Sequence, residues 1–212
     1  MSSMFDLSLY LVTDPAQTAA RGLLATVEQA VQGGVTIVQL RDPHAKGRAL
    51  VEQARALKAL LSPHGIPLII NDRVDVALAA DADGVHLGQD DIDPAAARGV
   101  LGAGRILGLS IGSPEELAAS DLSGVDYVGV GPVNATGTKG DAGGAIGVAG
   151  LAVLRKRISL PLVGIGGIDA ACAADVIRAG ADGIAVVSAL CKAGDVSAAA
   201  RDLTAIIAAA RA

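Results

Sequence analysis

Two aspartates in this chain each follow a short hydrophobic segment. Asp72 follows the apolar residues 67–70, and Asp91 follows the apolar residues 84–87. If both segments are parallel strands, their carboxyl ends meet at one edge and bring the two carboxylates within reach of one cation. Carboxylates without a nearby Cys pair or His-rich spacing favour Mg²⁺, which binds one or two carboxylates plus water and phosphate oxygens. The stretch therefore predicts a magnesium site.

Either aspartate has a second interpretation, because Asp also caps the first turn of a following helix. For one aspartate alone the two interpretations carry similar weight. The pair, placed at consecutive strand ends, favours the metal. Asp90 is the less favoured ligand and is interpreted as a solvated neighbour.

Two basic residues, Arg41 and Lys139, stand at predicted strand ends or in the loops that follow. Arg binds phosphate through two parallel hydrogen bonds and Lys supplies a point charge, although each can instead form an ion pair with nearby acids. Combined with a magnesium ion, they define a pyrophosphate pocket.

A glycine pair at 166–167, followed by Asp169 and a helical pattern, has the form of a phosphate-binding turn near the end of a barrel. A glycine pair alone is most often just a turn, so its position gives it weight. His86 at another strand end could act as an acid or base, but such a residue more often makes a structural hydrogen bond. No Ser/His/Asp or Cys/His nucleophile arrangement is recognisable.

The elements that must position these residues alternate along the whole chain. Eight strand-like segments each precede a helical pattern, which favours a (β/α)₈ TIM barrel in one catalytic domain, residues 1–212, over an open doubly wound sheet. Asp93 and Ser113 are predicted helix caps, followed by prolines 94 and 114, and Asp169 is predicted to cap a helix at 170–179. The strands are expected at 9–13, 35–40, 67–70, 84–87, 105–109, 125–130, 161–165 and 183–187, and the other well-defined helices at 23–32, 49–61, 74–80, 148–157 and 196–211.

Composition excludes several classes of protein. The 212 residues carry a net charge of −5 with both signs interspersed, so no basic stripe exists for nucleic acid or an anionic membrane. Cys172 and Cys191 are interpreted as small buried hydrophobes. The first residues show neither a basic nor an apolar signal region, so a cytoplasmic protein is expected.

The motifs, in their order along the chain, resemble those of the thiamine-phosphate synthase family. The resemblance runs from Leu-Tyr-Leu-Val-Thr-Asp at Leu9 to Val-Val-Ser-Ala at Val186. Its specific parts are Val-Gln-Leu-Arg ending at Arg41, Ile-Asn-Asp-Arg around Asp72, Gly-Val-His-Leu-Gly-Gln-Asp-Asp ending at Asp91, Thr-Gly-Thr-Lys ending at Lys139, Gly-Ile-Gly-Gly-Ile around Gly167, and Val187-Ser188.

The resemblance implies a transferase that joins 4-amino-2-methyl-5-hydroxymethylpyrimidine diphosphate to hydroxyethylthiazole phosphate, or its carboxylated form, and releases pyrophosphate. It implies catalytic roles for Arg41, Lys139 and Ser110, with Asp72 and Asp91 holding Mg²⁺. It also implies a pyrimidine diphosphate site of Gln39, Arg41, Asn71, Ser110 and Lys139, and a thiazole phosphate site of Thr136, Thr138, Gly167, Val187 and Ser188.

The chain departs from the family pattern after Arg41. The family commonly has Lys two residues later, where this chain has Pro43, and Lys46 is a candidate replacement. Residues 133–135 and 143–145 also differ from the usual Pro-rich sequences and predict a looser loop.

Three other functions share parts of this pattern. A related thiazole tautomerase has the same barrel but no use for a magnesium-diphosphate clamp. A catalytically silent barrel could bind phosphorylated ligands, and an unrelated phosphate-binding barrel enzyme would not need the paired acids. The expected partners are small molecules, with neither nucleic acid nor membrane, and a homo-oligomer is left open.

Overall fold

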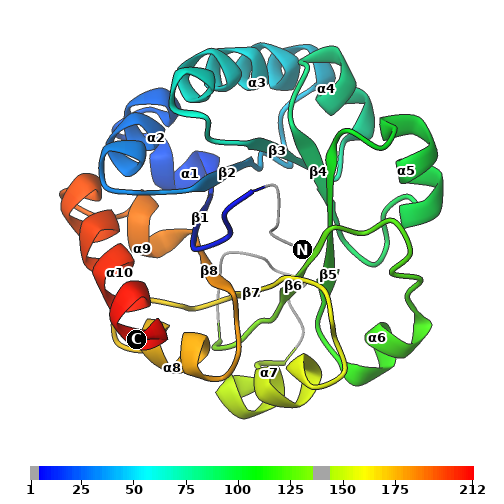
Figure 1. The fold of residues 1–212 in the computed structure, drawn as a ribbon. Helices are drawn as coiled ribbons and strands as arrows, with labels where there is room; N and C mark the ends of the chain where they lie inside the picture. Colours follow the sequence, from blue (N-terminus) through cyan, green and yellow to red (C-terminus); the bar gives the residue numbers. More distant parts are fainter. Residues whose placement is uncertain (1–4, 136–143) are drawn as a thin grey trace.

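A computed structural model describes residues 5–135 and 144–212. Within them, eight parallel strands close into one barrel, each strand pairing with the next and β8 with β1. Figure 1 looks along the barrel and shows the helices as an outer ring. The predicted single-domain TIM barrel is confirmed. The strands are β1 (Leu9–Val12), β2 (Ile37–Leu40), β3 (Leu68–Asn71), β4 (Gly84–Leu87), β5 (Ile106–Ile111), β6 (Tyr127–Val130), β7 (Leu162–Ile165) and β8 (Gly183–Val186).

The helices alternate with these strands and cover the outside of the barrel. The helices α2 and α10, like β4, have the bounds predicted from the sequence, whereas α1, α9 and the short 3₁₀ helix η1 were not predicted. The elements are α1 (Pro15–Thr18), α2 (Leu23–Gln32), α3 (Gly47–Leu61), η1 (Ser62–His64), α4 (Val74–Ala79), α5 (Pro94–Leu101), α6 (Pro114–Ala119), α7 (Gly147–Arg155), α8 (Ala173–Arg178), α9 (Ser188–Cys191) and α10 (Val196–Arg211).

Helix caps explain where several of these helices begin. The Asp93 carboxylate accepts from the N–H groups of Ala95 and Ala96, and the Ser113 hydroxyl accepts from the Glu116 N–H, so both predicted caps are confirmed. The predicted cap at Asp169 is wrong. Its carboxylate accepts from Ala171 N–H in a turn that precedes the helix, and α8 begins only at Ala173.

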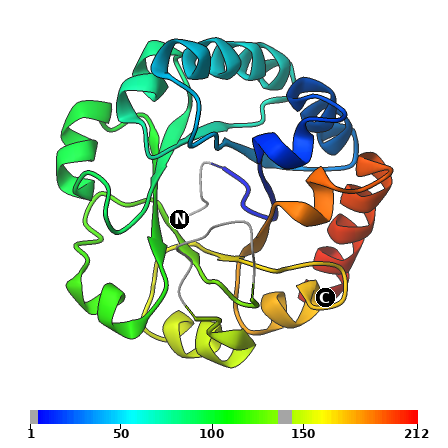
Figure 2. The same cartoon turned by 180° about the vertical axis from the view of Figure 1, so that it is seen from behind.

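The strands are buried on both faces, as expected for a parallel sheet covered by helices. One hydrophobic cluster fills the space between strands and helices. A second, smaller cluster contains inward-facing strand residues such as Tyr10 and Tyr127, and Phe5 and Leu7 of the N-terminal segment belong to it or pack against it. Figures 1 and 2 show this segment crossing the barrel opening.

The amino ends of the strands are fastened by a repeated arrangement, which we call the three strand-tying aspartates: Asp83, Asp126 and Asp182. Each immediately precedes an even-numbered strand. Its carboxylate accepts from the backbone N–H of the first or second residue of the preceding odd-numbered strand, and it forms an ion pair with a basic residue of a helix. The acceptor distances to Leu68 N, Leu107 N and Leu162 N are 2.8 Å each, and the ion pairs are with Lys58 at 2.6 Å, Arg98 at 2.7 Å and Arg155 at 3.2 Å.

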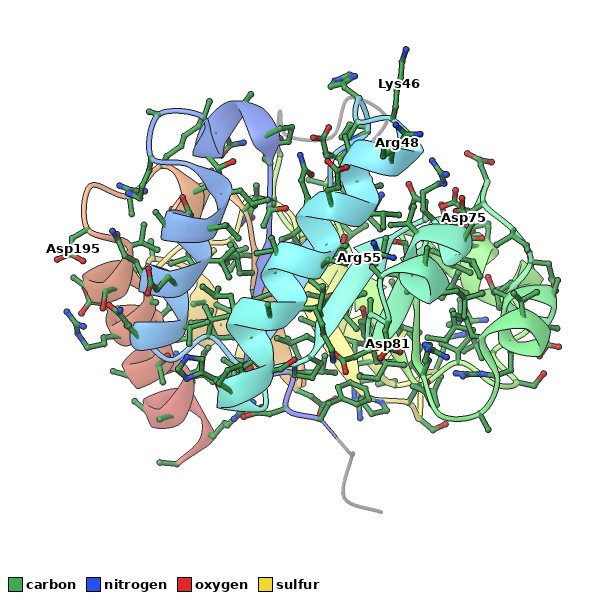
Figure 3. All side chains as sticks on the ribbon, turned by 90° about the horizontal axis from the view of Figure 1, so that it is seen from above. Lys46, Arg48, Arg55, Asp75, Asp81 and Asp195 are labelled. Atoms are coloured by element: carbon green, nitrogen blue, oxygen red, sulfur yellow. The ribbon has the colours of Figure 1, made fainter. Side chains whose placement is uncertain are left out.

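The side view in Figure 3 places Lys46 and Arg48 at the opposite end, where the strands have their carboxyl termini. Among the residues that the structure describes, no helix is long and apolar enough to cross a membrane.

Candidate active site at the carboxyl ends of the strands

A cavity of about 520 Å³ lies at the carboxyl ends of the strands. Its lining combines polar groups with the apolar side chains Val12, Val163 and Ile165. Such a mixture of apolar walls and a few converging polar groups is typical of small-molecule sites. Seven residues predicted for the site line this cavity: Gln39, Arg41, Asn71, Ser110, Gly167, Val187 and Ser188.

Three further predicted residues, Thr136, Thr138 and Lys139, lie outside the described residues. Among the described residues that flank them, Gly144 lines the cavity.

Asp72 directly follows β3 and has a left-handed backbone conformation, with φ of 62°. This conformation is costly for residues other than Gly and is tolerated best by Asn and Asp. The Asp72 N–H donates to the His86 carbonyl at 2.9 Å, and the Asn71 amide donates to the Asp72 carboxylate at 2.5 Å. The backbone and the neighbouring amide thus fix this carboxylate at the carboxyl end of β3.

Asp91 folds back over the turn that follows β4. Its carboxylate accepts from the Gly88 N–H at 2.6 Å, and a Cβ atom at Gly88 would lie 3.0 Å from the same oxygen. Asp90, the less favoured ligand, is exposed and lines the cavity. Asp72 and Asp91 are not part of the cavity lining.

The donor set of Asp72 and Asp91 fits Mg²⁺ by its chemistry. Both are hard carboxylates, and each is oriented by a hydrogen bond, from the Asn71 amide to Asp72 and from the Gly88 N–H to Asp91. No group of three or more His, Cys, Asp or Glu that could hold a metal occurs among the described residues. That finding is compatible with Mg²⁺, which commonly takes one or two carboxylates and completes its shell with phosphate oxygens and water.

The glycine pair after β7 has a specific steric reason. Gly166 and Gly167 have φ of 95° and 60°, and a Cβ atom at Gly166 would lie 2.6 Å from Pro132. The Asn134 amide donates to the Gly167 carbonyl at 3.0 Å, which ties this turn to the loop after β6. The turn therefore presents backbone to the cavity with no side chain in the way, as a phosphate-binding turn requires.

Arg41 lines the cavity directly after β2, and its backbone N–H donates to the Thr13 hydroxyl at 3.1 Å. Lys46, the candidate replacement for the family lysine, is exposed at the N-cap of α3. Figure 3 shows its side chain extending outward from the rim, and it does not line the cavity.

A buried chain of hydrogen bonds connects two of the predicted residues across the barrel. The Gln39 amide donates to the Tyr10 hydroxyl at 2.8 Å, and the Tyr10 and Tyr127 hydroxyls are 2.9 Å apart. The Tyr127 hydroxyl lies 2.9 Å from His86 Nδ1, and His86 Nε2 lies 2.9 Å from the Ser110 hydroxyl. His86 therefore makes side-chain hydrogen bonds through both ring nitrogens.

Sequence reasoning missed Tyr10 and Tyr127. Burial raises the pKa of both phenols above their usual value of 10. A usable signal existed, because these are the two tyrosines of the chain and both fall within strand-like segments. Their contact across 117 residues has no local signature.

Comparison with known proteins gives a consistent answer. A profile described as thiamine monophosphate synthase matches residues 9–190. The chain is 73% identical over 211 residues to a thiamine-phosphate synthase of Xanthobacter autotrophicus, covering 100% of each chain, and 51% identical over 207 residues to one of Chloroflexus aurantiacus, covering 98% of this chain and 95% of the relative. A solved structure of a thiamine phosphate pyrophosphorylase from Pyrococcus furiosus superimposes with a TM-score of 0.88 at 35% identity, covering 97% of this chain and 98% of that one.

Proposed function

The chain belongs to the thiamine monophosphate synthase family, and we propose that its cavity joins hydroxymethylpyrimidine diphosphate to hydroxyethylthiazole phosphate with release of pyrophosphate. The family activity itself, formation of thiamine phosphate by a transferase, is the activity of this chain. The proposal concerns the substrates, the metal and the residues that act on them.

The diphosphate is assigned to the rim formed after β2, β3 and β4. Arg41 contacts the diphosphate oxygens, and Lys139 supplies a second positive charge. Asp72 and Asp91 would hold Mg²⁺, which when bound neutralises charge on the diphosphate. Charge that develops on the leaving group is stabilised best by groups that are already in place, and the hydrogen bonds to Asp72 and Asp91 support such an arrangement.

The two ring systems occupy different parts of the cavity. Gln39, Asn71 and Ser110 bind the aminopyrimidine, and this assignment is supported by their common position in the cavity lining. The thiazole phosphate binds at the glycine turn and the start of α9. Its proposed contacts are Thr136, Thr138, Gly167, Val187 and Ser188.

The reaction proceeds by dissociation. The bond between the pyrimidine methylene carbon and the diphosphate oxygen breaks with both electrons leaving on oxygen, and the thiazole nitrogen then donates its lone pair to the methylene carbon. No protein nucleophile is required, in agreement with the lack of a recognisable nucleophile arrangement in the sequence. Loss of a cationic contact should therefore slow ionisation more than it weakens substrate binding.

The observation that carries the proposal is the convergence of Gln39, Arg41, Asn71, Ser110 and the glycine turn on one cavity, since these groups come from separate strands. A thiazole tautomerase would share the turn but would have no use for the acids at the ends of β3 and β4. A cytoplasmic location and a homo-oligomer stay predictions.

The test supplies both substrates and Mg²⁺ and measures thiamine phosphate and pyrophosphate in the same samples. We expect the two products in equal amounts with wild type, and neither when one substrate is omitted. A large loss is expected in Asp72→Ala. Absence of product with wild type, or unchanged turnover in Asp72→Ala, would reject the proposed mechanism.

A further inference from the structure

The buried chain from Gln39 through Tyr10, Tyr127 and His86 to Ser110 crosses the barrel from β2 to β5. Four of its members line the cavity, whereas Tyr127 is 0% exposed and does not. Tyr127 therefore connects the two sides without being available for contact with a ligand in the cavity. Any effect of its hydroxyl on ligand binding must pass through its hydrogen-bond partners.

Hydrogen counting allows this chain of hydrogen bonds two directions. Each neutral phenol has one proton, and burial, which raises the pKa of both, keeps them neutral. The Gln39 amide donates to Tyr10, and in one of the two directions that the distances permit, the Tyr10 proton goes to the Tyr127 oxygen and the Tyr127 proton to His86 Nδ1. A neutral imidazole that accepts at Nδ1 carries its proton on Nε2.

The direction has a consequence at the far end. In this direction the Nε2–H group of His86 donates to the Ser110 oxygen, and the Ser110 hydroxyl proton is not used within the chain of hydrogen bonds. Ser110 lines the cavity, and its proton is thus offered to whatever acceptor the cavity holds. If the chain ran in the opposite direction, Ser110 would give its proton to His86 instead.

The barrel makes room for this chain at two interior glycines. Gly108 lies beside both His86 and Tyr127 in the strand register. A Cβ atom there would be 2.4 Å from His86 Nδ1 and 2.3 Å from the Tyr127 ring, so it would occupy the space around their hydrogen bond. A Cβ at Gly129 would be 3.1 Å from the other side of the imidazole. The two glycines therefore leave the space that the imidazole ring of His86 occupies.

We propose that Tyr10 and Tyr127 are positioning residues that fix His86 in the Nε2–H form and thereby make Ser110 a hydrogen-bond donor to a ring nitrogen of the aminopyrimidine. The inference rests on the proposed function for the identity of the ligand. Recognition of the aminopyrimidine ring then depends in part on Tyr127, a buried residue that does not line the cavity. A ring nitrogen without a donor opposite it would remain desolvated and unpaired, which is the usual cause of large selectivity.

A double-mutant cycle tests the coupling. The affinity of 4-amino-2-methyl-5-hydroxymethylpyrimidine, which lacks the diphosphate, is measured by calorimetry in wild type, Tyr127→Phe, Ser110→Ala and the double variant. We expect Tyr127→Phe to weaken binding about tenfold with Ser110 present, and less than about twofold in the Ser110→Ala background. An equal loss in both backgrounds means that Tyr127 acts only on the fold and overturns the proposal.

Matched variants keep the test interpretable. Tyr10→Phe cuts the same chain one bond earlier and should show the same dependence on Ser110, including if Tyr127→Phe fails to fold. Thr36→Val removes a hydroxyl that bonds to the Leu9 backbone at the amino end of the barrel, away from the chain, and should leave the affinity unchanged. Coupling of the same size in Thr36→Val would also contradict the proposal.

A spectroscopic measurement examines the direction of the chain without ligand. Imidazole ¹⁵N spectra of wild type distinguish the two ring nitrogens, and the protein contains three histidines whose signals must be assigned. We expect His86 with its proton on Nε2, and a proton on Nδ1 would overturn the proposal. If His86 gives the expected spectrum but the protein does not bind the aminopyrimidine, the substrate assignment is rejected. If the protein forms product but Tyr127 and Ser110 show no coupling, the proposed role of the hydrogen-bond chain is rejected.

Discussion

The two ends of the barrel use aspartate in different ways. At the amino end, the three strand-tying aspartates each accept from a strand N–H and form an ion pair with a Lys or Arg of a helix. At the carboxyl end, the Asp72 carboxylate accepts from the Asn71 amide and the Asp91 carboxylate accepts from the Gly88 N–H, and these bonds orient the two carboxylates. The aspartates at the amino end thus stabilise the fold, whereas those at the carboxyl end are the proposed metal ligands, where barrel enzymes place their active sites.

The largest effect should separate two aspartates with the same unusual backbone. Asp72 and Asp81 both have positive φ, at 62° and 52°, and lie near opposite ends of α4. Asn tolerates this conformation, so Asp72→Asn removes the charge with little strain. We expect kcat/KM for thiamine phosphate formation to fall about 10²–10³-fold, with Tm nearly unchanged.

Asp81→Asn is the control. Asp81 pairs with Arg105 at 2.8 Å and its side chain is 87% exposed, so its loss should cost less than about 1 kcal/mol and leave kcat/KM within about twofold of wild type. Similar losses of kcat/KM in Asp72→Asn and Asp81→Asn would contradict the proposed difference between the two ends of the barrel.

The second effect concerns the amino end. Asp126→Ala removes the acceptor for the buried Leu107 N–H and the partner of Arg98. We expect the free energy of unfolding to fall by about 1–3 kcal/mol, measured by urea denaturation, with kcat/KM unchanged where the protein is folded. Asp126→Asn, which keeps an acceptor oxygen, should recover part of the stability. A selective loss of turnover in Asp126→Ala would break the comparison.

A smaller effect should distinguish neighbours on the loop after β4. Asp93 caps α5 with hydrogen bonds to two backbone N–H groups, so Asp93→Ala should cost about 1 kcal/mol of stability and little activity. Asp91→Asn keeps an acceptor for Gly88 N–H and removes a proposed metal ligand, so it should lower kcat at least about tenfold. Thermal unfolding and steady-state kinetics are measured on both variants. If Asp93→Ala lowered kcat and Asp91→Asn lowered only stability, Asp91 would not be a metal ligand.

Lys46 should contribute least. Its side chain extends from the rim and does not line the cavity, and an exposed charge at a distance is screened by salt. We expect Lys46→Ala to change kcat/KM by less than about twofold, against about 10–100-fold for Arg41→Ala. A large loss in Lys46→Ala would mean that this side chain replaces the family lysine after all.

Local patterns were sufficient for most of the fold. Hydrophobic periodicity located α2, β4 and α10, and the caps Asp93 and Ser113 followed from residue type. The cap at Asp169 failed because an Asp that closes a turn and an Asp that caps a helix have the same sequence signature. Ser110, expected after its strand, lies within β5, since a strand end depends on pairing with its neighbours.

The site was predictable only in part. Polar residues at strand ends identified Gln39, Arg41 and Asn71 as cavity residues, because the barrel brings all carboxyl ends together. The contact of Tyr10 with Tyr127 depends on closure of the whole barrel and on the space left by Gly108. No local pattern carries that information, and the positions of the metal and substrates likewise stay predictions.

The most direct test of the contrast between the two ends is to locate the cation. Crystals grown with Mn²⁺ in place of Mg²⁺ and with inorganic pyrophosphate would reveal the metal by its anomalous scattering. We predict a single strong peak bound by the carboxylates of Asp72 and Asp91 and by pyrophosphate oxygens. Pyrophosphate bound in the cavity with no metal at these two aspartates, or with the metal at Asp90 instead, would contradict the account.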